Sequence, residues 1–417
     1  MSNQKDEKVK EFDNSSKKKM DKRLFIIFIV MFTEILGFSM LLPVIPFLGL
    51  SLGLNALEVS IVLSLFNICQ FFSAPIIGKL SDRYGRKPLL LTSQLATFAG
   101  FMLLGFANAI WILILARVVD GLLGSNFTVS QAYISDVTEP KDRTRVFGYS
   151  SAVFGAALIF GPLIGGVLST ISYSTPMFLA SGISLVSIIL MIFFLPESLE
   201  ERAKNVKFRF EDIVPIQDAK RFFKNPKIIG IIIIYFFYNI GFFLFMSTFS
   251  LFAEKQIYIG PLEIGFLTTW IGVFRVFFQS VLITPVQEKF GEDPTLKIGV
   301  LTMILSMVIL IFITTYWVAY IAFIFLAYGT GVGRPILTSK LSKSVEREET
   351  GSVMGVNNSF SSIAQIIAPI IGGAILVYLP SQTLPLSSGL ILLCILLLWR
   401  WGITNPSKSD EEINKNN

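Results

Sequence analysis

Long apolar segments recur along the whole sequence and limit what the chain can fold into. Twelve of them approach the roughly 20 residues that an α-helix needs to cross a hydrocarbon layer about 30 Å thick. The expected spans are 24–48, 58–78, 89–107, 110–136, 145–170, 174–195, 227–252, 261–284, 295–314, 316–342, 350–378 and 383–404. Because backbone in lipid must satisfy its own hydrogen bonds, this pattern predicts an all-α membrane protein with twelve transmembrane helices.

Composition agrees with this prediction and argues against several other classes of protein. Hydrophobic residues make up 53% of the chain and charged residues only 15%. Histidine is absent, and the two cysteines, Cys69 and Cys394, lie far apart in apolar segments, so neither a metal site nor a disulfide framework is indicated. No G-x-x-x-x-G-K-[ST] motif and no nucleophile–base pattern occurs, so we expect neither an ATP-driven pump nor an enzyme, and no cofactor.

The distribution of basic residues predicts the orientation in the membrane. With the N-terminus inside, 31 of the 35 Lys and Arg residues fall in cytoplasmic loops and tails. This asymmetry is what the positive-inside rule expects of a multi-pass protein of the cell membrane with both termini in the cytoplasm. It also accounts for the net charge of +6 without a nucleic-acid partner.

Two motifs return at nearly the same displacement. GKLSDRYGRKP at 78–88 is echoed by TPVQEKFGEDP at 284–294, and FGPLIGG at 160–166 by IAPIIGG at 367–373, with offsets of 206 and 207. Two matches in register indicate a parallel repeat of two six-helix halves. The expected organisation is a tail 1–23, a first half 24–195, a linker 196–226, a second half 227–404 and a tail 405–417.

Several segments resemble a known family. GKLSDRYGRKP resembles the signature loop of the major facilitator superfamily, and RVVDGLLGSNFTVSQAYISD at 117–136 is similar to its fourth-helix motif. GAALIFGPLIGG at 155–166 resembles the fifth-helix motif of its antiporters. The resemblance extends over 24–404 and implies the twelve-helix fold of that superfamily.

Within the superfamily, the chain resembles drug:proton antiporters of the tetracycline-efflux type. EILGFSMLLP at 34–43, GVFRVFFQSVLITPVQEKFG at 272–291 and GVGRPILTSKLS at 331–342 carry this likeness. Two departures matter: Met303 falls near the family's acidic residue in the ninth helix, and Arg275 near its histidine in the eighth. These departures argue against tetracycline itself as the substrate.

The resemblance implies that the loop at 78–88 latches the cytoplasmic side when the protein faces outward. Asp82 would then face the N-terminus of the eleventh helix near Thr350, where the helix dipole favours an anion, and Arg86 would pair with Asp136. The candidate gate residues are Gly78, Asp82, Arg83, Gly85, Arg86, Lys87, Asp136 and Glu288. The alternative interpretation is a solvated loop that only sets topology.

The fifth span is rich in small residues. Its candidate antiporter motif consists of Gly155, Gly161, Pro162, Gly165 and Gly166. The resemblance implies a tight interface between the halves that does not leak protons. The alternative is ordinary close packing of two helices, which small residues at four-residue spacing permit.

Charges inside the spans are the strongest candidates for chemistry, because each costs several kcal/mol near the bilayer centre. Glu34 lies ten residues into the first span, about 15 Å deep, and is the expected proton-responsive group. Arg117 and Asp120 share a face of the fourth helix and serve either coupling or simple mutual neutralisation. The candidate cavity residues are Glu34, Arg117, Asp120, Asn126, Gln131, Asn239, Arg275 and Gln279, and Arg334 has no assigned role.

These features predict a secondary transporter that works by alternating access. The expected activity is proton-coupled efflux of a small amphiphilic or cationic organic compound by a protein that functions as a monomer in the lipid bilayer. The alternatives are proton-coupled uptake of a sugar, carboxylate or other metabolite, and a membrane sensor that transports nothing.

Overall fold

The structure is a computed structural model, and it describes residues 21–199 and 215–402. Within these residues every regular element is helical. The predicted tail 405–417, most of the tail 1–23 and the central part of the linker 196–226 lie outside the described residues.

The N-terminal group of helices begins directly after Asp21. It comprises α2 (Lys22–Leu41), α3 (Ile45–Ser51), α4 (Ala56–Tyr84), α5 (Arg86–Gly105), α6 (Ile110–Leu123), α7 (Asn126–Val137), α8 (Arg143–Ser169) and α9 (Ser174–Phe194). Six stretches of this group have the length and hydropathy to span a membrane, with α6 and α7 forming one span between them.

The C-terminal group repeats this plan. After the short α10 (Ile216–Phe222) it comprises α11 (Pro226–Met246), α12 (Phe249–Ile257), α13 (Pro261–Phe277), α14 (Ile283–Phe290), α15 (Glu292–Ile311), α16 (Tyr316–Lys343), α17 (Thr350–Tyr378) and α18 (Thr383–Gly402). Five stretches here are long and apolar enough to span a membrane, and α18 adds a shorter apolar stretch, Thr383–Trp399. The prediction of twelve membrane helices is confirmed.

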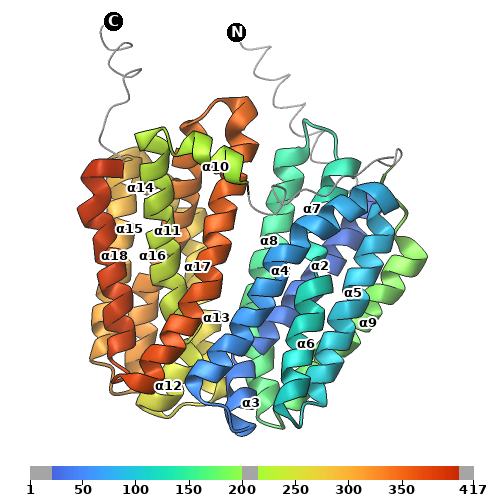
Figure 1. Cartoon of the computed structure of the whole chain (residues 1–417), viewed down its shortest axis with the longest axis horizontal. Helices are drawn as coiled ribbons and strands as arrows, with labels where there is room; N and C mark the ends of the chain where they lie inside the picture. Colours follow the sequence, from blue (N-terminus) through green and yellow to red (C-terminus); the bar gives the residue numbers. More distant parts are fainter. Residues whose placement is uncertain (1–20, 200–214, 403–417) are drawn as a thin grey trace, which may run out of the picture.

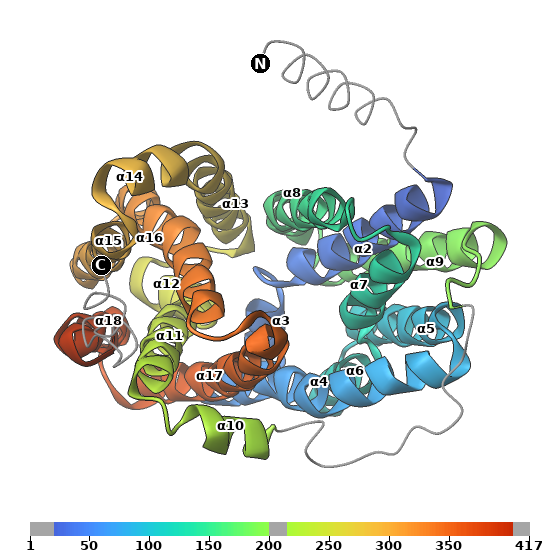
Figure 2. The ribbon, with the colours of Figure 1, turned by 90° about the horizontal axis from the view of Figure 1, so that it is seen from above.

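The two groups form two halves that stand side by side (Figure 1). One side of the molecule carries α10 and the loop between α7 and α8, and we call it the α10 side; the opposite side carries α3 and α12, and we call it the α3 side. Seen along the membrane normal, α8 lies next to α13 and α4 next to α17, so these two helix pairs join the halves (Figure 2).

Three of the predicted spans are interrupted in the structure, two of them at helix-breaking residues. Pro43, which has no N–H, separates α2 from α3. Gly124 and Ser125 separate α6 from α7. The span predicted to run to residue 252 ends at Met246, where the Thr248 hydroxyl donates a hydrogen bond back to a carbonyl of the last turn.

The eighth span is also irregular. Between α13 and α14 the chain forms a π-helix, Phe278–Leu282. Pro285 lies three residues beyond its last residue, and a proline ring clashes with the carbonyl four residues before it, here inside the π-helix, so the wider π turn relieves this crowding. The register of an uninterrupted α-helix therefore does not continue from Arg275 to Gln279.

The halves touch on the α3 side and separate toward the α10 side. A Cβ added to Gly265 of α13 would lie 2.5 Å from the Pro162 carbonyl oxygen of α8, and one added to Gly373 of α17 would lie 2.7 Å from the Ala56 carbonyl oxygen of α4. Near the α10-side end of α17, a Cβ on Gly351 would meet no atom within 4 Å outside its own helix. The described conformation is therefore closed on the α3 side and open on the α10 side (Figure 1).

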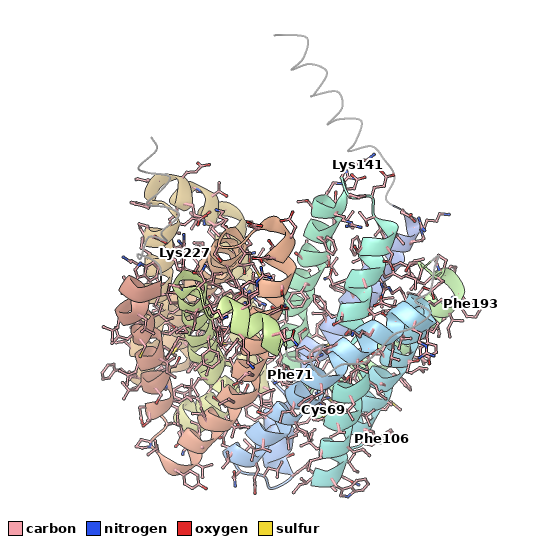
Figure 3. All side chains as sticks on the ribbon, turned by 45° about the horizontal axis from the view of Figure 1, so that its top comes forward. Cys69, Phe71, Phe106, Lys141, Phe193 and Lys227 are labelled. Carbon is pink, nitrogen blue, oxygen red and sulfur yellow. The ribbon has the colours of Figure 1, made fainter. Side chains whose placement is uncertain are left out.

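Large apolar side chains cover the perimeter of the bundle. Phe106 is 64% exposed and Phe193 is 74% exposed, and both point away from the helix bundle (Figure 3). A soluble protein rarely exposes so much contiguous apolar surface, whereas a lipid-facing surface requires it.

Candidate functional site

The segment 78–88 folds into a sharp turn held by charge pairs. Gly85 joins α4 to α5 with a φ of +107°, a conformation that favours glycine. Arg86 Nη1 lies 2.6 Å from Asp82 Oδ1, and Arg86 Nε lies 3.0 Å from Asp136 Oδ2 at the end of α7. The structure thus contains the Arg86–Asp136 pair that the family resemblance implied.

Asp82 does not reach α17 in this conformation. Its carboxylate pairs with Arg86, while the first turn of α17 bonds to α10, with Ser352 donating to Asp218. Because the halves are separated on the α10 side, the implied contact between Asp82 and Thr350 is not formed. That contact remains a prediction for a conformation closed on this side.

Glu197, at the end of α9, holds the turn from the other side, and sequence analysis missed it. Its Oε1 accepts a hydrogen bond of 2.8 Å from the Arg86 backbone N–H, and its Oε2 one of 3.3 Å from the Lys87 N–H. A Cβ on Gly85 would lie 2.3 Å from Oε2, which explains why glycine is needed there. The carboxylate caps the positive end of α5, as helix-dipole arguments expect.

The other gate residues lie around this turn. Lys87 Nζ donates a 3.0 Å hydrogen bond to the Ile192 carbonyl, and the Arg83 guanidinium lies 5.2 Å from the centre of the exposed Tyr84 ring. Gly78 faces α7, where an added Cβ would lie 3.6 Å from Thr128 Cγ2. Lys87 therefore ties the turn to α9, while Arg83 stays at the surface.

The repeat of this turn in the second half has the opposite arrangement of charge. Glu288, which aligns with Asp82, is exposed and makes no ion pair within residues 215–402. Asp293 instead pairs with Lys340 at the end of α16, and Glu292 lies 2.6 Å from Lys343. At the repeat offset of 206, Glu292 aligns with Arg86, so the Glu292–Lys343 pair is the counterpart of Arg86–Asp136 with its charges exchanged.

The glycine-rich part of α8 serves two interfaces. A Cβ on Gly161 would lie 1.8 Å from Ser39 Oγ of α2, and one on Gly165 would lie 2.0 Å from the Met40 carbonyl oxygen, so these glycines pack α8 within its own half. Gly166 and the Pro162 carbonyl face α13 of the other half. One face of the helix therefore packs within its own half and the other contacts the opposite half, while exclusion of protons at this interface stays a prediction.

Near Gly155 the packing between α8 and α13 is less close than near Gly166. An added Cβ there would lie 3.7 Å from Val276 Cγ2, ordinary van der Waals contact, whereas backbone meets backbone at Gly166. Contact between α8 and α13 is thus closest near the α3 side.

Glu34, Arg117 and Asp120 place charge inside the N-terminal half. Arg117 is 2% exposed and Asp120 is 4% exposed, and Arg117 Nη2 lies 3.7 Å from Asp120 Oδ2. The Glu34 Oε2 is shielded from solvent, has no hydrogen-bond partner among the described residues and lies within electrostatic range of Asp120. Arg117 thus pairs with Asp120 and not with Glu34 among the described residues, and the choice between coupling and simple neutralisation for Arg117 and Asp120 stays open.

Neighbouring residues donate a hydrogen bond to Asp120 but leave two nitrogens of Arg117 without an acceptor. Thr97 Oγ1 donates a 3.0 Å hydrogen bond to Asp120 Oδ1, and the Arg117 guanidinium lies 5.5 Å from the centre of the Phe66 ring. Nε and Nη2 of Arg117 have no hydrogen-bond acceptor among the described residues. A buried guanidinium with free donors is a ready partner for an incoming acceptor. Sequence analysis missed Thr97 and Phe66, although Thr97 lies on one face of α5 with another polar residue, Gln94.

Two predicted cavity residues are bonded within the N-terminal half. Asn126 is fully buried and donates a 2.8 Å hydrogen bond to Gln94 Oε1. Gln131 donates a 3.2 Å hydrogen bond to Ser150 Oγ, which in turn lies 3.8 Å from the Met31 sulfur. Asn126 therefore connects helices of one half, whereas Gln131 lies on the α2–α7–α8 side together with Met31, one turn from Glu34.

In the C-terminal half, the predicted residues lie on three helices. Asn239 of α11 donates a 2.9 Å hydrogen bond to Ser361 of α17, so it joins helices of one half. Gln279 lies exposed in the π-helix. Arg275 lies within electrostatic range of Tyr238 and Arg334, and sequence analysis did not predict this grouping.

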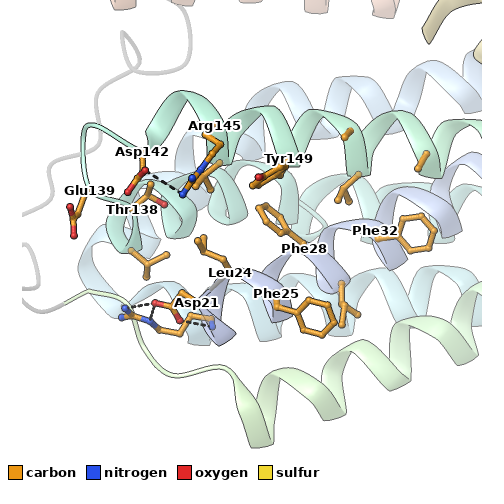
Figure 4. A pocket seen from close by; sticks show the side chains of 17 residues that line it. Asp21, Leu24, Phe25, Phe28, Phe32, Thr138, Glu139, Asp142, Arg145 and Tyr149 are labelled. Atoms are coloured by element: carbon orange, nitrogen blue, oxygen red, sulfur yellow. Dashed lines mark hydrogen bonds and ion pairs between the residues drawn. The ribbon is translucent and has the colours of Figure 1, made fainter. Parts of the chain in front are cut away.

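A groove of about 1030 Å³ opens between α2 and the α7–α8 region (Figure 4). Phe25, Phe28 and Phe32 line it, and Asp21 lies at its mouth, where a hydrogen bond from Arg23 holds the pKa of Asp21 below its usual value. At 100° per residue, Phe25 and Phe32 lie on the face of α2 opposite Glu34. The groove is thus separate from the charged cluster.

Comparison with known proteins agrees with this geometry. The family model described as Major Facilitator Superfamily matches residues 27–258 and 231–417. Tetracycline resistance protein, class H, of Pasteurella multocida is 32% identical over 84% of this chain and 88% of its own. Multidrug resistance protein 2 of Bacillus subtilis is 28% identical over 84% and 88%. A bacterial homologue of the human lysosomal transporter Spinster, solved in an inward-facing and unoccupied conformation, shares the fold with a TM-score of 0.75, 12% identity and coverage of 91% and 97%.

Proposed function

The chain belongs to the major facilitator superfamily, a family of transporters rather than enzymes, and we propose that it exports small amphiphilic or cationic organic compounds in exchange for protons. The similarity to a tetracycline resistance protein and to a multidrug resistance protein over most of both chains supports drug efflux. Met303 supports a substrate other than tetracycline, because an apolar side chain is fully buried against Gly329 at the place where the family resemblance implies an acidic residue.

The observation that carries the proposal is the group formed by Glu34, Arg117 and Asp120. Charged side chains inside a transmembrane domain rarely lack a functional role, because burying each one costs several kcal/mol of free energy. Here one carboxylate oxygen and two guanidinium nitrogens have no partner among the described residues. A proton or a cationic compound relieves the cost of the unpaired Glu34 carboxylate, so the two ligands compete for it.

Competition for Glu34 gives exchange a simple mechanism. A protonated Glu34 is neutral and does not attract a cation, while a bound cation disfavours protonation. If the halves alternate between two conformations, the protein releases one ligand on each side of the membrane and binds the other. The open α10 side and the closed α3 side fit one of these two conformations.

We assign the α10 side to the cytoplasm. This side carries the basic segment 79–88 and the basic end of α16, as the positive-inside rule expects. The protein then lies in the cell membrane with both termini in the cytoplasm and works as a monomer, since each chain holds both halves of the site.

The test is a susceptibility panel in a bacterial host that lacks its own efflux pumps. Expression of the protein should raise the inhibitory concentration of several amphiphilic compounds, and collapse of the proton gradient with an uncoupler should abolish energy-dependent export of a fluorescent member. An uptake symporter would instead increase accumulation inside the cells. No change in the movement of any compound, with the protein present in the membrane, would contradict the proposed function.

A further inference from the structure

The C-terminal half contains two cations without anions. Arg275 of α13 and Arg334 of α16 form no ion pair and no side-chain hydrogen bond with any described residue. Arg275 lies beside the turn of α16 that precedes Arg334, since a Cβ on Gly331 would lie 3.6 Å from Arg275 Cγ, and like charges on helices packed this way repel each other. Like charges held together in a membrane domain require an anion from elsewhere.

The C-terminal half itself offers no suitable anion. On its spanning helices, Glu263 lies at the α3-side end of α13, where it caps Gly260 with a 3.0 Å hydrogen bond, and Glu288 is exposed in the last turn of α14, away from Arg275 across the π-helix. Glu292 and Asp293 are paired with lysines at the α10 side. Helices α11, α16 and α17 contain neither Asp nor Glu. The compensating charge must therefore come from the other half or from a ligand.

Arg334 is placed where a ligand can reach it, and the partly buried Arg275 packs against the same helix. Arg334 is exposed, and α16 lies on the side of its half that faces the N-terminal half (Figure 2). Close packing brings the other components together: a Cβ on Gly331 would lie 3.0 Å from the Arg275 carbonyl oxygen, and one on Gly333 would lie 2.6 Å from the Tyr238 ring. Glycines at 331 and 333 thus let α16 approach α13 and α11 closely enough to group the charges.

We propose that Arg275 and Arg334 bind an acidic group of the transported compound, a carboxylate or an enolate, from the C-terminal half. This inference rests on the proposed transport function and narrows its substrate class. A planar guanidinium presents two parallel N–H donors that match the two oxygens of a carboxylate. The preferred compound is then an amphiphile with an acidic group at one end, and its cationic part, if it has one, faces Glu34.

Rhodamine B and its ethyl ester test this inference, because they share one fluorescent cationic ring system and differ in a carboxylate. Efflux of each dye from pump-deficient cells is followed for the wild type and for Arg275→Gln, Arg334→Gln and Lys224→Gln. Lys224 is an exposed cation outside the site, and its replacement removes the same charge. Fluorescence-detected size-exclusion chromatography reports whether each variant is folded.

The wild type should export rhodamine B in preference to the ester. Each arginine replacement should reduce rhodamine B export by about tenfold or more, the effect of a lost charged hydrogen bond, and should leave export of the ester unchanged. The Lys224→Gln control should export both dyes as the wild type does. Arg275→Lys and Arg334→Lys, which keep charge without the fork, should give intermediate loss.

Three other outcomes separate the two proposals. Export of the ester alone, or equal loss of both dyes in folded arginine variants, would overturn the acidic-group assignment while leaving efflux intact. Absence of export of either dye and of every compound in the susceptibility panel would contradict transport itself.

Discussion

Replacing Gly265 with alanine should drive the halves apart on the α3 side. The new Cβ would lie 2.5 Å from the Pro162 carbonyl oxygen and 3.0 Å from Gly166 Cα. Both are backbone atoms, so no side-chain rotation relieves the clash. Overpacking of this kind costs about 1–3 kcal/mol. If the cost falls only on the conformation closed on the α3 side, the equilibrium between conformations shifts about 5- to 150-fold toward the other one.

The distance between spin labels measures this shift directly. Labels at Ile171, which is 74% exposed, and at the exposed Thr314 lie on the α3 side of different halves, in a background without Cys69 and Cys394. Pulsed electron spectroscopy on Gly265→Ala should show a larger population at long distance than the parent protein. The shift should be absent in Gly182→Ala, where an added Cβ meets nothing within 4 Å.

A second control separates conformational change from general damage. Gly165→Ala introduces a harder clash, 2.0 Å from the Met40 carbonyl oxygen, but within one half. It should lower thermal stability without changing the ratio of the two distance populations. An unchanged distance distribution in a folded Gly265→Ala protein, or the same shift in Gly165→Ala, would refute the claim that the contact at Gly265 stabilises the conformation closed on the α3 side.

Three further predictions follow from the α10 side. A cysteine at Asn55 should react with an impermeant thiol reagent added outside the cell and one at Lys224 should not; the reverse labelling would overturn the orientation. Glu197→Gln should lower the melting temperature by several degrees, because it removes a charged cap worth about 1.5–3 kcal/mol. Glu288→Gln, at an exposed residue, should leave the melting temperature unchanged. Equal melting curves for the two variants would refute the capping role of Glu197. Asp82→Asn should reduce the long-distance population between the Ile171 and Thr314 labels and slow transport, and an unaltered population would contradict the latch.

The sequence predicts the helices well because the thickness and apolar character of the bilayer set their length and hydropathy, largely independently of how the helices pack. All twelve spans appear within a few residues of their expected positions. The breaks at Pro43 and Gly124 and the π-helix before Pro285 were missed, because hydropathy is averaged over a window of residues and stays high across a local change in backbone conformation. Each break nevertheless has a proline or glycine that gave a local signal.

From the residues alone, contacts in the candidate site could be predicted only between neighbours in sequence, and the Arg86–Asp136 pair was predicted only through the family resemblance. Arg117 and Asp120, three residues apart, share a helix face by geometry alone. Glu197 and Lys340 contact their partners across more than 40 positions of sequence, and only the fold brings them together. The repeat aligned Glu288 with Asp82, but in the structure Glu288 is exposed and Glu292, which aligns with Arg86, is the residue paired with a lysine of α16.

The most direct test of the account measures pH-driven transport in Glu34→Gln vesicles. Glutamine has the shape of protonated glutamate and cannot titrate. Purified wild-type protein in vesicles should concentrate a transported dye against its gradient when a pH gradient is imposed. Glu34→Gln should insert and fold normally but lose this uphill transport, and its residual dye binding should not depend on pH between about 5 and 8. Vesicles containing Glu34→Gln that still concentrate the dye in response to the imposed gradient would contradict the central claim.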